Sequence, residues 1–484
     1  MNKIKKILVP FVSALMIASA VLPMASCGDG KGGGSKVNTG DMKVVAYDGS
    51  EVTVTFYHTM GEKLREVLDA YIPEFNKIYP NITIDHGSKG DYPGLRDQIS
   101  TELTAGNSPS LAYCYPDHVA LYNKAKAVLV LDDYIKSDLT VAATNEKVGF
   151  TQEQLDDFVS AYYKEGSVYG DGKMYTLPYS KSTEVLYYNK TFFEENDLSV
   201  PTTWDEMEAL CKQIKEMPGH KKSIIPLGYD SEANWFITMT EQYGTPYTSA
   251  KKGEYFLFNT AENRAFVEKF RDWYNKGYVI TEETYGGSYT SNLFTDKDAK
   301  QRSYMCIGSS GGASYQNPAK NSEGKYPFEV GVAMIPQVNK EDPKIISQGP
   351  AICLFKKQNE QEVAAAWLFA KFLTTNVALQ AEFSEASGYA PVIKSVNQDE
   401  EYAKFLEKAD GNAYLQASVI KQCLAQQENC YVSPAFVGSS AARDQVGLLM
   451  QNCFVKKLEG KTVAQFIQDE FDAVLEELQF DYGN

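Results

Sequence analysis

The chain between residues 52 and 115 alternates short strand-like runs with helix-like periodicity. Residues 52–57 read Val-Thr-Val-Thr-Phe-Tyr, which is the alternation of a half-buried strand. From Leu64 to Phe75 apolar side chains recur every three or four residues, as on one face of a helix. The same patterns predict two more strands and one more helix, over 82–84, 111–115 and 95–103. The order strand–helix–strand–helix–strand predicts a parallel sheet with helices on its faces, in an α/β fold.

Three loops of this predicted sheet combine tyrosine with polar residues. They are Tyr57-His58, Gly90-Asp91-Tyr92 and Tyr115-Pro116-Asp117, and each follows a predicted strand. Ligands of parallel α/β sheets bind beyond the carboxyl ends of the strands. We therefore expect a ligand to lie against Tyr57, His58, Tyr92, Tyr115 and Asp117.

Beyond residue 180 a second set of elements is predicted. Residues 184–188 read as a strand, and Thr203 and Glu206 have the spacing of a capping box at the start of a helix. Further strands are predicted at 300–307, 328–334 and 351–355. The remaining predicted helices cover 361–375, 377–384, 400–409, 413–424 and 462–478.

The N-terminus has the pattern of an export signal. Three lysines precede an apolar run over 7–22, and small residues lead to Cys27. Residues 22–27, Leu-Pro-Met-Ala-Ser-Cys, resemble the lipobox of bacterial lipoproteins, a family in which this cysteine carries the lipid. We expect a signal peptide over 1–26 and a flexible tether over 27–41. No other segment is long and apolar enough to span a membrane, so membrane contact is expected through the lipid only.

Composition narrows the function classes. The chain has 484 residues, 47 Lys plus Arg against 63 Asp plus Glu, and a formal net charge of −16. An acidic surface repels phosphate backbones, which argues against a nucleic acid partner. With four histidines there is little scope for metal or proton-transfer sites, so neither a metal nor a cofactor is expected.

Seven of the eight cysteines lie beyond the predicted signal peptide. The number is odd and no C-x-x-C pair occurs, so neither a zinc site nor a dense disulfide frame is indicated. Three of them stand in apolar, strand-like runs and are expected in the core: Cys114, Cys306 and Cys353. A disulfide is left open as either Cys423–Cys430 or Cys430–Cys453.

Residues 308–312, Gly-Ser-Ser-Gly-Gly, match the G-x-S-x-G pattern of a hydrolase nucleophile. Hydrolases with this motif place the catalytic histidine after the serine in chain order, whereas the last histidine here is His220. A crossing between domains, which needs the conformational freedom of glycine, is the favoured interpretation. No pattern in the chain demands catalysis, and we expect a protein that is not an enzyme.

Several segments resemble, in the same order, the carbohydrate-type, maltose-binding-like solute-binding proteins of bacterial ABC importers. The segments are Leu177-Pro178-Tyr179-Ser180, 187–190, 201–206, 331–336 and 388–391. Within this family the chain looks closest to glycerol-3-phosphate-binding proteins, through residues 56–61, 89–92 and 309–311.

The resemblance implies a two-lobe, periplasmic-binding-protein-like fold of type II with about three crossings between the lobes. We expect the crossings near Ser180, Ser309 and Gly349. Lobe one would then contain 42–179 plus 310–347, and lobe two 180–309 plus 348–484.

The resemblance also assigns ligand-site positions. These are Tyr92, Ser182, Trp235, Ser309, Ser310, Gly349 and Tyr389. The family's phosphate-pairing arginine has no counterpart in the stretch 434–438, and Arg443 is displaced from it. Because a bidentate arginine is the best phosphate anchor, the sequence favours a neutral sugar or oligosaccharide.

The expected protein is therefore an exported lipoprotein on the outer face of the cell membrane. It would bind a sugar between its lobes as a monomer and deliver it unchanged to the membrane subunits of an ABC permease. Binding of glycerol-3-phosphate or a glycerophosphodiester is the alternative within this class. An exported glycan-degrading enzyme and a surface protein that holds wall glycan or another protein are the alternatives outside it.

Overall fold

The computed structural model describes residues 34–296 and 301–483. The predicted signal peptide over 1–26, the lipid attachment site Cys27 and residues 28–33 of the predicted tether lie outside the described residues.

The first of two five-stranded sheets has the strand order β3-β2-β5-β13-β6. β2 is parallel to β3 and β5, which confirms the parallel sheet predicted from the pattern, and β13 is antiparallel to β5 and β6. The strands are β2 (Val52–His58), β3 (Ile82–Ser88), β5 (Leu111–Cys114), β6 (Thr176–Pro178) and β13 (Ala351–Leu354). This sheet is the centre of lobe one.

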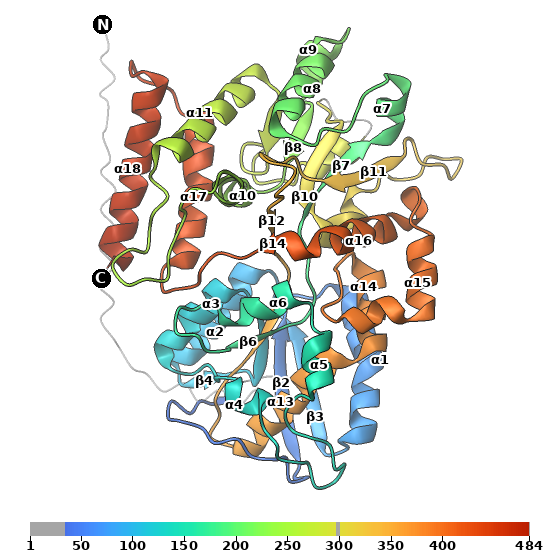
Figure 1. Cartoon of the computed structure of the whole chain (residues 1–484), viewed down its shortest axis with the longest axis vertical. Coiled ribbons are helices and arrows are strands. Elements are labelled where there is room, and N and C mark those ends of the chain that lie inside the picture. The colour runs from blue at the N-terminus through green and yellow to red at the C-terminus, as the bar shows by residue number, and fades with distance from the viewer. Residues whose placement is uncertain (1–33, 297–300, 484) are drawn as a thin grey trace, which may run out of the picture. The chain divides into compact units, whose positions relative to one another are not determined.

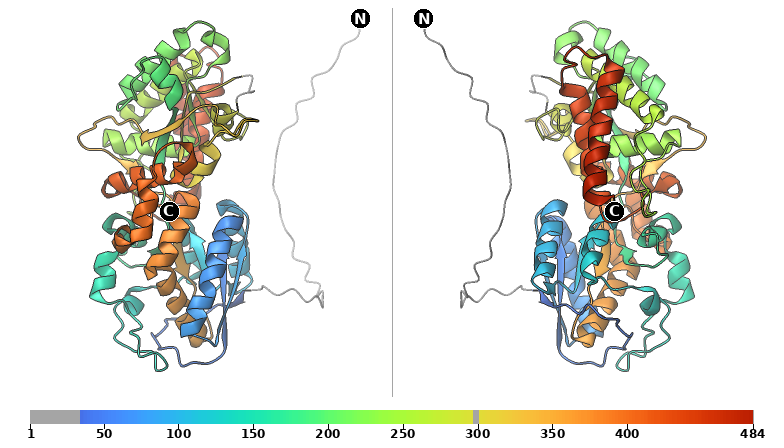
Figure 2. Two further views of the ribbon diagram at one scale, coloured as in Figure 1. Left: turned by 90° about the vertical axis from the view of Figure 1, so that its right-hand side faces the viewer. Right: turned by 90° about the vertical axis from the view of Figure 1, so that its left-hand side faces the viewer.

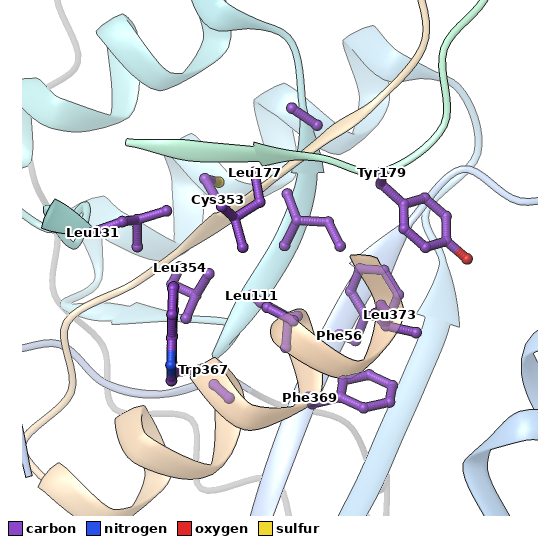
Figure 3. Close-up of a cluster of buried hydrophobic side chains, with 14 of the residues drawn as sticks. Phe56, Leu111, Leu131, Leu177, Tyr179, Cys353, Leu354, Trp367, Phe369 and Leu373 are labelled. Carbon is purple, nitrogen blue, oxygen red and sulfur yellow. The ribbon is translucent and has the colours of Figure 1, made fainter. Parts of the chain in front are cut away.

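Helices pack on lobe one's sheet through large apolar side chains. The main ones are α1 (Glu62–Ile78), α2 (Tyr92–Thr104), α13 (Glu360–Thr375) and α14 (Val377–Ser387). α13 lies against β2 and buries Phe369 beside Phe56, while Trp367 lies beside Leu354 (Figure 3). The Trp367 indole N–H donates to the carbonyl of Val148 at 2.7 Å, so this ring has no unsatisfied polar atom.

The second sheet has the strand order β11-β7-β10-β8-β9 and is the centre of lobe two. Its strands are β7 (Glu184–Asn189), β8 (Leu227–Tyr229), β9 (Val279–Thr281), β10 (Met305–Ser309) and β11 (Val330–Met334). The helices that bury its core include α8 (Trp204–Glu216), α10 (Glu232–Tyr243), α11 (Ala261–Lys276), α17 (Ser439–Val455) and α18 (Val463–Tyr482). α8 begins with the predicted capping box, in which Thr203 and Glu206 satisfy each other's backbone N–H.

Two further helices and several short elements complete the described part of the chain. α16 (Leu415–Gln426) packs on β11 and α14, and α15 (Glu400–Glu407) packs on α14 and α16. The short strands are β1 (Ser35–Lys36), β4 (Asn107–Ser108), β12 (Ile345–Ile346) and β14 (Cys430–Tyr431). The short helices are α3 (Pro116–Tyr122), α4 (Asp132–Ile135), α5 (Gln152–Asp157), α6 (Ser160–Lys164), α7 (Lys190–Glu195), α9 (His220–Ser223) and α12 (Ser291–Thr295).

Three segments connect the lobes (Figure 1). The first, 179–183, joins β6 to β7, and the second, 335–350, joins β11 to β13 through β12. The third contains β14, which pairs in parallel with β12 and leads to α17. Ser180 and Gly349, near which two crossings were predicted, lie in the first and second of these segments.

The crossing predicted near Ser309 is wrong. Ser309 ends β10, and the chain remains on the second sheet until β11. The glycines here serve close packing instead of a hinge. A Cβ on Gly308 would lie 2.8 Å from an Asp230 carboxylate oxygen, and one on Gly311 would lie 2.7 Å from the Tyr389 ring.

The predicted lobe boundaries also need correction. Residues 310–347 were expected in lobe one, yet β11 pairs with β7 in the sheet of lobe two. Residues 348–484 were expected in lobe two, yet β13 and α13 belong to lobe one. The chain returns fully to lobe two only with α17, after α16 has packed on elements of both lobes. These memberships are set by pairings more than one hundred residues apart in sequence, which local pattern does not encode.

The C-terminal part of the predicted tether is bound to lobe one. Ser35 and Lys36 form β1, which pairs antiparallel with β4. The Ser35 hydroxyl donates to the Glu362 carboxylate at 2.7 Å. The predicted tether over 27–41 therefore ends before Gly34, whose missing Cβ admits the Ser108 carbonyl.

All seven described cysteines are free, and six of them are buried. Cys114, Cys306 and Cys353 lie in the core as predicted, whereas neither disulfide left open by the sequence is formed. Within 34–296 and 301–483, no helix combines the length and apolar character needed to cross a membrane.

Candidate functional site

A cavity of about 230 Å³ lies between the two lobes, beside the connecting segments. Lobe one contributes the first residues of α2 and α3, and lobe two contributes α10 and the first residues of α17. The connecting segments contribute 346–348 and 432–435. The right-hand view of Figure 2 shows the C-terminal helix α18, in dark red, in the upper lobe and the N-terminal elements, in blue, in the lower lobe.

The wall on lobe one is built by two helix N-termini. Asp91 caps α2 by accepting from the Gly94 N–H at 2.9 Å, and this places Tyr92 at the first position of the helix. Tyr115 precedes α3, in which Pro116 holds the first position. The rings of Tyr92 and Tyr115 are 4.5 Å apart between centroids, so they form one aromatic surface.

On lobe two, the cavity wall contains Arg443, whose side chain is positioned by hydrogen bonds to buried residues of the same lobe. Arg443 on α17 donates to the side-chain oxygen of Asn234, whose amide donates to Glu184 at 2.9 Å. The Tyr229 hydroxyl donates to the other Glu184 oxygen at 2.6 Å. Burial raises the pKa of Glu184 to about 7, and these hydrogen bonds and the Arg443 charge oppose that shift.

Arg96 on α2 reaches across to the opposite lobe. Its guanidinium donates to the Ser440 hydroxyl at 3.1 Å and lies 3.9 Å from an Asp444 oxygen, both at the start of α17. It also pairs with Asp97 at 2.9 Å. The two lobes are thus joined across the cavity by one arginine, in addition to the three connecting segments.

Four buried polar atoms that line the cavity have no hydrogen-bond partner. They are His118 Nδ1, Tyr247 OH, Thr248 Oγ1 and Gln348 Oε1. Burial lowers the pKa of His118, so its imidazole is neutral near pH 7. Leaving a buried polar group unpaired costs free energy, and clusters of such groups call for an explanation. A bound solute with hydroxyl groups would supply the missing partners.

Three of the residues predicted from sequence lie on the cavity wall: Tyr92, Tyr115 and Asp117. Burial raises the pKa of the Tyr92 and Tyr389 phenols, and the neighbouring tyrosines add to both shifts, so Tyr389 lies close to Tyr92 and Tyr115. Its ring packs on the backbone of Gly311. These residues come together from α2, α3 and the turn after α14.

Tyr57 and His58 do not line the cavity. The His58 imidazole is buried and lies 3.0 Å from a ring nitrogen of His86, and burial lowers its pKa to about 3. Tyr57 is also buried; its hydroxyl donates to Glu102 at 3.2 Å, and the Lys89 ammonium lies 4.0 Å from its ring centroid. Both side chains at the end of β2 are held by lobe one itself.

Trp235 also does not line the cavity. It is fully buried in the core of lobe two, stacked on Tyr229 at 4.8 Å and 4.1 Å from Phe270 between centroids. Its neighbours on α10 include Asn234, which supports Arg443, and Ile237, which lines the cavity. The tryptophan therefore supports the wall of lobe two from inside.

The remaining predicted site residues belong to the crossings or pack beside them. Ser182 exchanges backbone hydrogen bonds with Gln348 at 2.9 and 2.8 Å. Ser310 accepts from the Thr183 N–H at 3.2 Å, and Ser309 precedes it at the end of β10. Gly349 has φ +86°, and a Cβ there would lie 2.5 Å from the Ser180 carbonyl oxygen. None of these four lines the cavity.

The sequence interpretation missed most of lobe two's wall. Arg443, Ser439 and Ser440 lie on α17, a helix absent from the predicted set. Tyr247 and Thr248 follow α10, and His118 directly follows the predicted Asp117. Among the polar residues that were missed, His118 and Gln348 stand next to predicted site residues, whereas Ser439, Ser440, Tyr247 and Thr248 carried no such local signal.

Across the part of the chain that the structure describes, no group of three or more His, Cys, Asp or Glu side chains is arranged to hold a metal ion.

Residues 70–408 match the profile of a family described as bacterial extracellular solute-binding protein. This match covers more than half of the chain, and the chain therefore belongs to that family. The family is extracellular, so the protein is exported.

Relatives and solved structures agree with this assignment. The sn-glycerol-3-phosphate-binding periplasmic protein UgpB of Shigella flexneri serotype 5b is 25% identical over 374 residues, which are 74% of this chain and 78% of UgpB. UgpB from Mycobacterium tuberculosis in complex with glycerophosphocholine has a TM-score of 0.69 at 18% identity, over 89% of this chain and all of that one.

The ABC substrate-binding protein Lmo0181 from Listeria monocytogenes in complex with cycloalternan has a TM-score of 0.68 at 16% identity, over 89% of this chain and 99% of that one. The family match confirms the predicted class, an extracellular solute-binding protein, and the solved structures confirm the predicted two-lobe fold.

Proposed function

We propose that the protein binds a small sugar or similar polyhydroxylated solute in the cavity between its lobes and delivers it to the membrane subunits of an ABC permease. The observation that carries this proposal is the set of four unpartnered polar atoms around one cavity, beside two tyrosine rings. Sugars have apolar faces ringed by hydroxyl groups, so they match neighbouring aromatic rings and unpaired hydrogen-bonding groups together.

The size of the cavity favours a short ligand. Binding sites for small molecules usually have volumes of about 300 to 1,000 Å³, and this one, at about 230 Å³, lies just below that range. One or two sugar rings fit this volume better than a long oligosaccharide does.

A glycerophospho-ligand is the second candidate, and a specific observation favours it. The sequence argument against phosphate was the displacement of Arg443, yet its side chain lines the cavity, as does Arg96. Arginine binds phosphate oxygens through two parallel hydrogen bonds. Asp117, Glu165 and Asp444 line the same cavity and repel an anion, which is why the neutral solute remains our first proposal.

A thermal-shift screen separates the two candidates. The probes are maltose, maltotriose, glycerol-3-phosphate and glycerophosphocholine, each over a range of concentrations. At 100 times its Kd a ligand adds about 2.7 kcal/mol to the free energy of unfolding, which is readily measured. Stabilisation by a neutral sugar alone supports the first proposal, stabilisation by the phosphate compounds alone supports the second, and no shift with any probe contradicts both.

The solute is expected to leave the protein unchanged. The curated relative UgpB and the structural neighbour Lmo0181 are binding proteins by name, and no bond needs to be made or broken for the proposed role. Incubation of the identified ligand with the protein, followed by mass spectrometry, should recover only the starting compound. A time-dependent product would instead indicate an exported glycan-degrading enzyme.

Lipid anchoring at Cys27 is a further part of the proposal. Seven peptide units separate Cys27 from Gly34, where the described structure begins, and fully extended they span about 25 Å at most. Lobe one would thus stay near the membrane surface. Replacement of Cys27 by alanine should release the mature protein from the membrane fraction, and retention of the variant there would contradict a lipid anchor. We also expect the released protein to sediment as a monomer.

A further inference from the structure

A buried ion pair lies where the segments that connect the lobes meet. Lys181 stands on the first connecting segment, and its side chain is fully buried, as is nearly all of Glu165. The Lys181 ammonium donates to the two Glu165 oxygens at 2.9 and 2.8 Å and to the Gly349 carbonyl at 3.1 Å. All three of its protons are therefore used within one small region.

The same carboxylate binds the second connecting segment and reaches the third through it. The Ser347 hydroxyl donates to Glu165 at 3.0 Å. The backbone N–H of Ser347 donates to the Tyr431 carbonyl at 2.8 Å, in the third segment. Glu165 itself belongs to lobe one, so one carboxylate ties that lobe to all the crossings.

Glu165 also lines the ligand cavity, together with Ser347 and Gln348. A carboxylate has about four acceptor positions, of which Lys181 and Ser347 occupy three here. The remaining position is available to a solute hydroxyl. A buried ion pair is costly to desolvate, and packed apolar residues can replace such pairs without loss of stability. A contribution to overall stability therefore does not explain why this ion pair is present. Its position between the connecting segments and the cavity offers an explanation.

We infer that Glu165 is a positioning residue for solute binding: through Lys181 and Ser347 it holds the connecting segments in the register that the cavity between the lobes requires. This inference rests on the proposed function for its link to binding. The effect of Glu165 on the connecting segments is measured without any ligand. A failure of this inference can therefore be distinguished from a failure of the proposed function.

The test compares hydrogen exchange in three variants of the exported chain. Glu165→Gln removes the charge, and Glu165→Gln with Lys181→Met removes the whole pair. The matched control is Glu362→Gln. Like Glu165, Glu362 is buried, lies near a lysine (3.9 Å from the Lys357 ammonium) and accepts a hydrogen bond from a serine, Ser110, at 2.7 Å. Unlike Glu165, it does not line the cavity.

Exchange of backbone amides in 179–183, 345–350 and 430–434 should be at least tenfold faster in both Glu165 variants and unchanged there in Glu362→Gln. The melting temperature of the double variant should stay near that of the wild type. Faster exchange at the crossings in this variant would then reflect a local effect on the connecting segments and not a loss of overall stability. Wild-type exchange at the crossings in both Glu165 variants would overturn the inference. A uniform acceleration across both lobes would overturn it as well.

Binding provides the second readout. Maltose, maltotriose and glycerophosphocholine serve as probes, and the probe that binds the wild type should bind the double variant at least tenfold more weakly. Equal affinity in the double variant and the wild type would overturn the positioning role. If the wild type binds none of the probes, the proposed ligand class fails, and the exchange experiment still decides the role of Glu165.

Discussion

Thr248 and Thr240 show how the same side chain serves two purposes within ten residues of chain. The Thr248 hydroxyl lines the cavity and has no partner, whereas the Thr240 hydroxyl on α10 donates to the Ile237 carbonyl at 2.7 Å. A buried hydroxyl with a hydrogen-bond partner in the protein stabilises the fold. A buried hydroxyl without one lowers the stability unless a bound ligand supplies the partner. Because Thr248 also lines the cavity, its hydroxyl is available to a ligand, whereas that of Thr240 is committed to the fold.

Thr248→Val should therefore weaken ligand binding while leaving the unliganded protein as stable as the wild type, or more stable by up to about 1 kcal/mol. Thr240→Val should do the reverse, with a loss of about 1 kcal/mol and no change in affinity. Urea denaturation and calorimetric titration with the ligand found in the screen would measure both effects. Equal effects of the two substitutions on affinity would exclude Thr248 from the site.

The raised pKa of Glu184 predicts that the free energy of unfolding depends on pH. Burial raises its pKa from 4.5 to about 7, so between these values the native state retains a proton that the unfolded state releases. The free energy of unfolding must then fall as pH rises through this window, by about 3 kcal/mol for this group. Glu184→Gln removes this contribution, and its stability should depend less on pH than that of the wild type.

Urea denaturation of both proteins at pH 4.5 and 7.5 measures the difference. Glu282, whose pKa burial also raises to about 7, titrates in the same window and leaves a residual slope in the variant. Parallel stability profiles for the wild type and Glu184→Gln would show that Glu184 is ionised in the native protein throughout.

At the scale of elements, helix N-termini and chain crossings decide where the site lies. α2, α3 and α17 all begin at the cavity, so their first residues form its walls from opposite lobes. The first and second crossings approach so closely that Gly349, with φ +86°, is required between them. The arrangement of the lobes thus depends on backbone packing within a few residues of the ligand.

Gly349→Ala should destabilise the protein by at least about 1–3 kcal/mol, because the new Cβ would lie 2.5 Å from the Ser180 carbonyl oxygen and the backbone is left-handed there. Gly312→Ala is the control, since nothing lies within 4 Å of its Cβ and its φ is not positive. Thermal melts of both variants check the prediction. A Gly349→Ala protein with wild-type stability would mean that the crossings separate easily.

At the scale of the whole molecule, a ligand held by two lobes couples binding to their relative arrangement. Contacts made by both lobes favour the closed arrangement, so the ligand shifts the equilibrium between open and closed forms. The arginine bridge from Arg96 to Ser440 and Asp444 adds a contact between the lobes beside the cavity.

The ligand should therefore reduce the radius of gyration measured by small-angle X-ray scattering. Arg96→Ala should weaken this compaction, because it removes the bridge to α17. Asp97→Ala, which removes the surface partner of Arg96 but neither of its contacts on α17, serves as the control. An unchanged radius of gyration at saturating ligand would contradict closure around the solute.

The sequence by itself determined the local elements and the class of protein. Alternation over 52–57, helical spacing from Leu64 to Phe75 and the capping box at Thr203 are short-range signals, and each of these elements is present in the structure. Tyr92, Tyr115 and Asp117 were predicted because they follow parallel strands, whose ends share one edge of a sheet.

Only the tertiary structure decided which lobe each later segment joins and which polar groups surround the cavity. β11 and β13 exchange the lobes expected of them because their partners, β7 and β5, are more than one hundred residues away. For the same reason Trp235, which was expected in the site, is buried in the core of lobe two, and Arg443, which was expected outside the site, lines the cavity. Burial depends on neighbours from distant elements. Periodicity records which side of a helix or strand is apolar, whereas burial and pairing depend on the contacts that the whole chain makes.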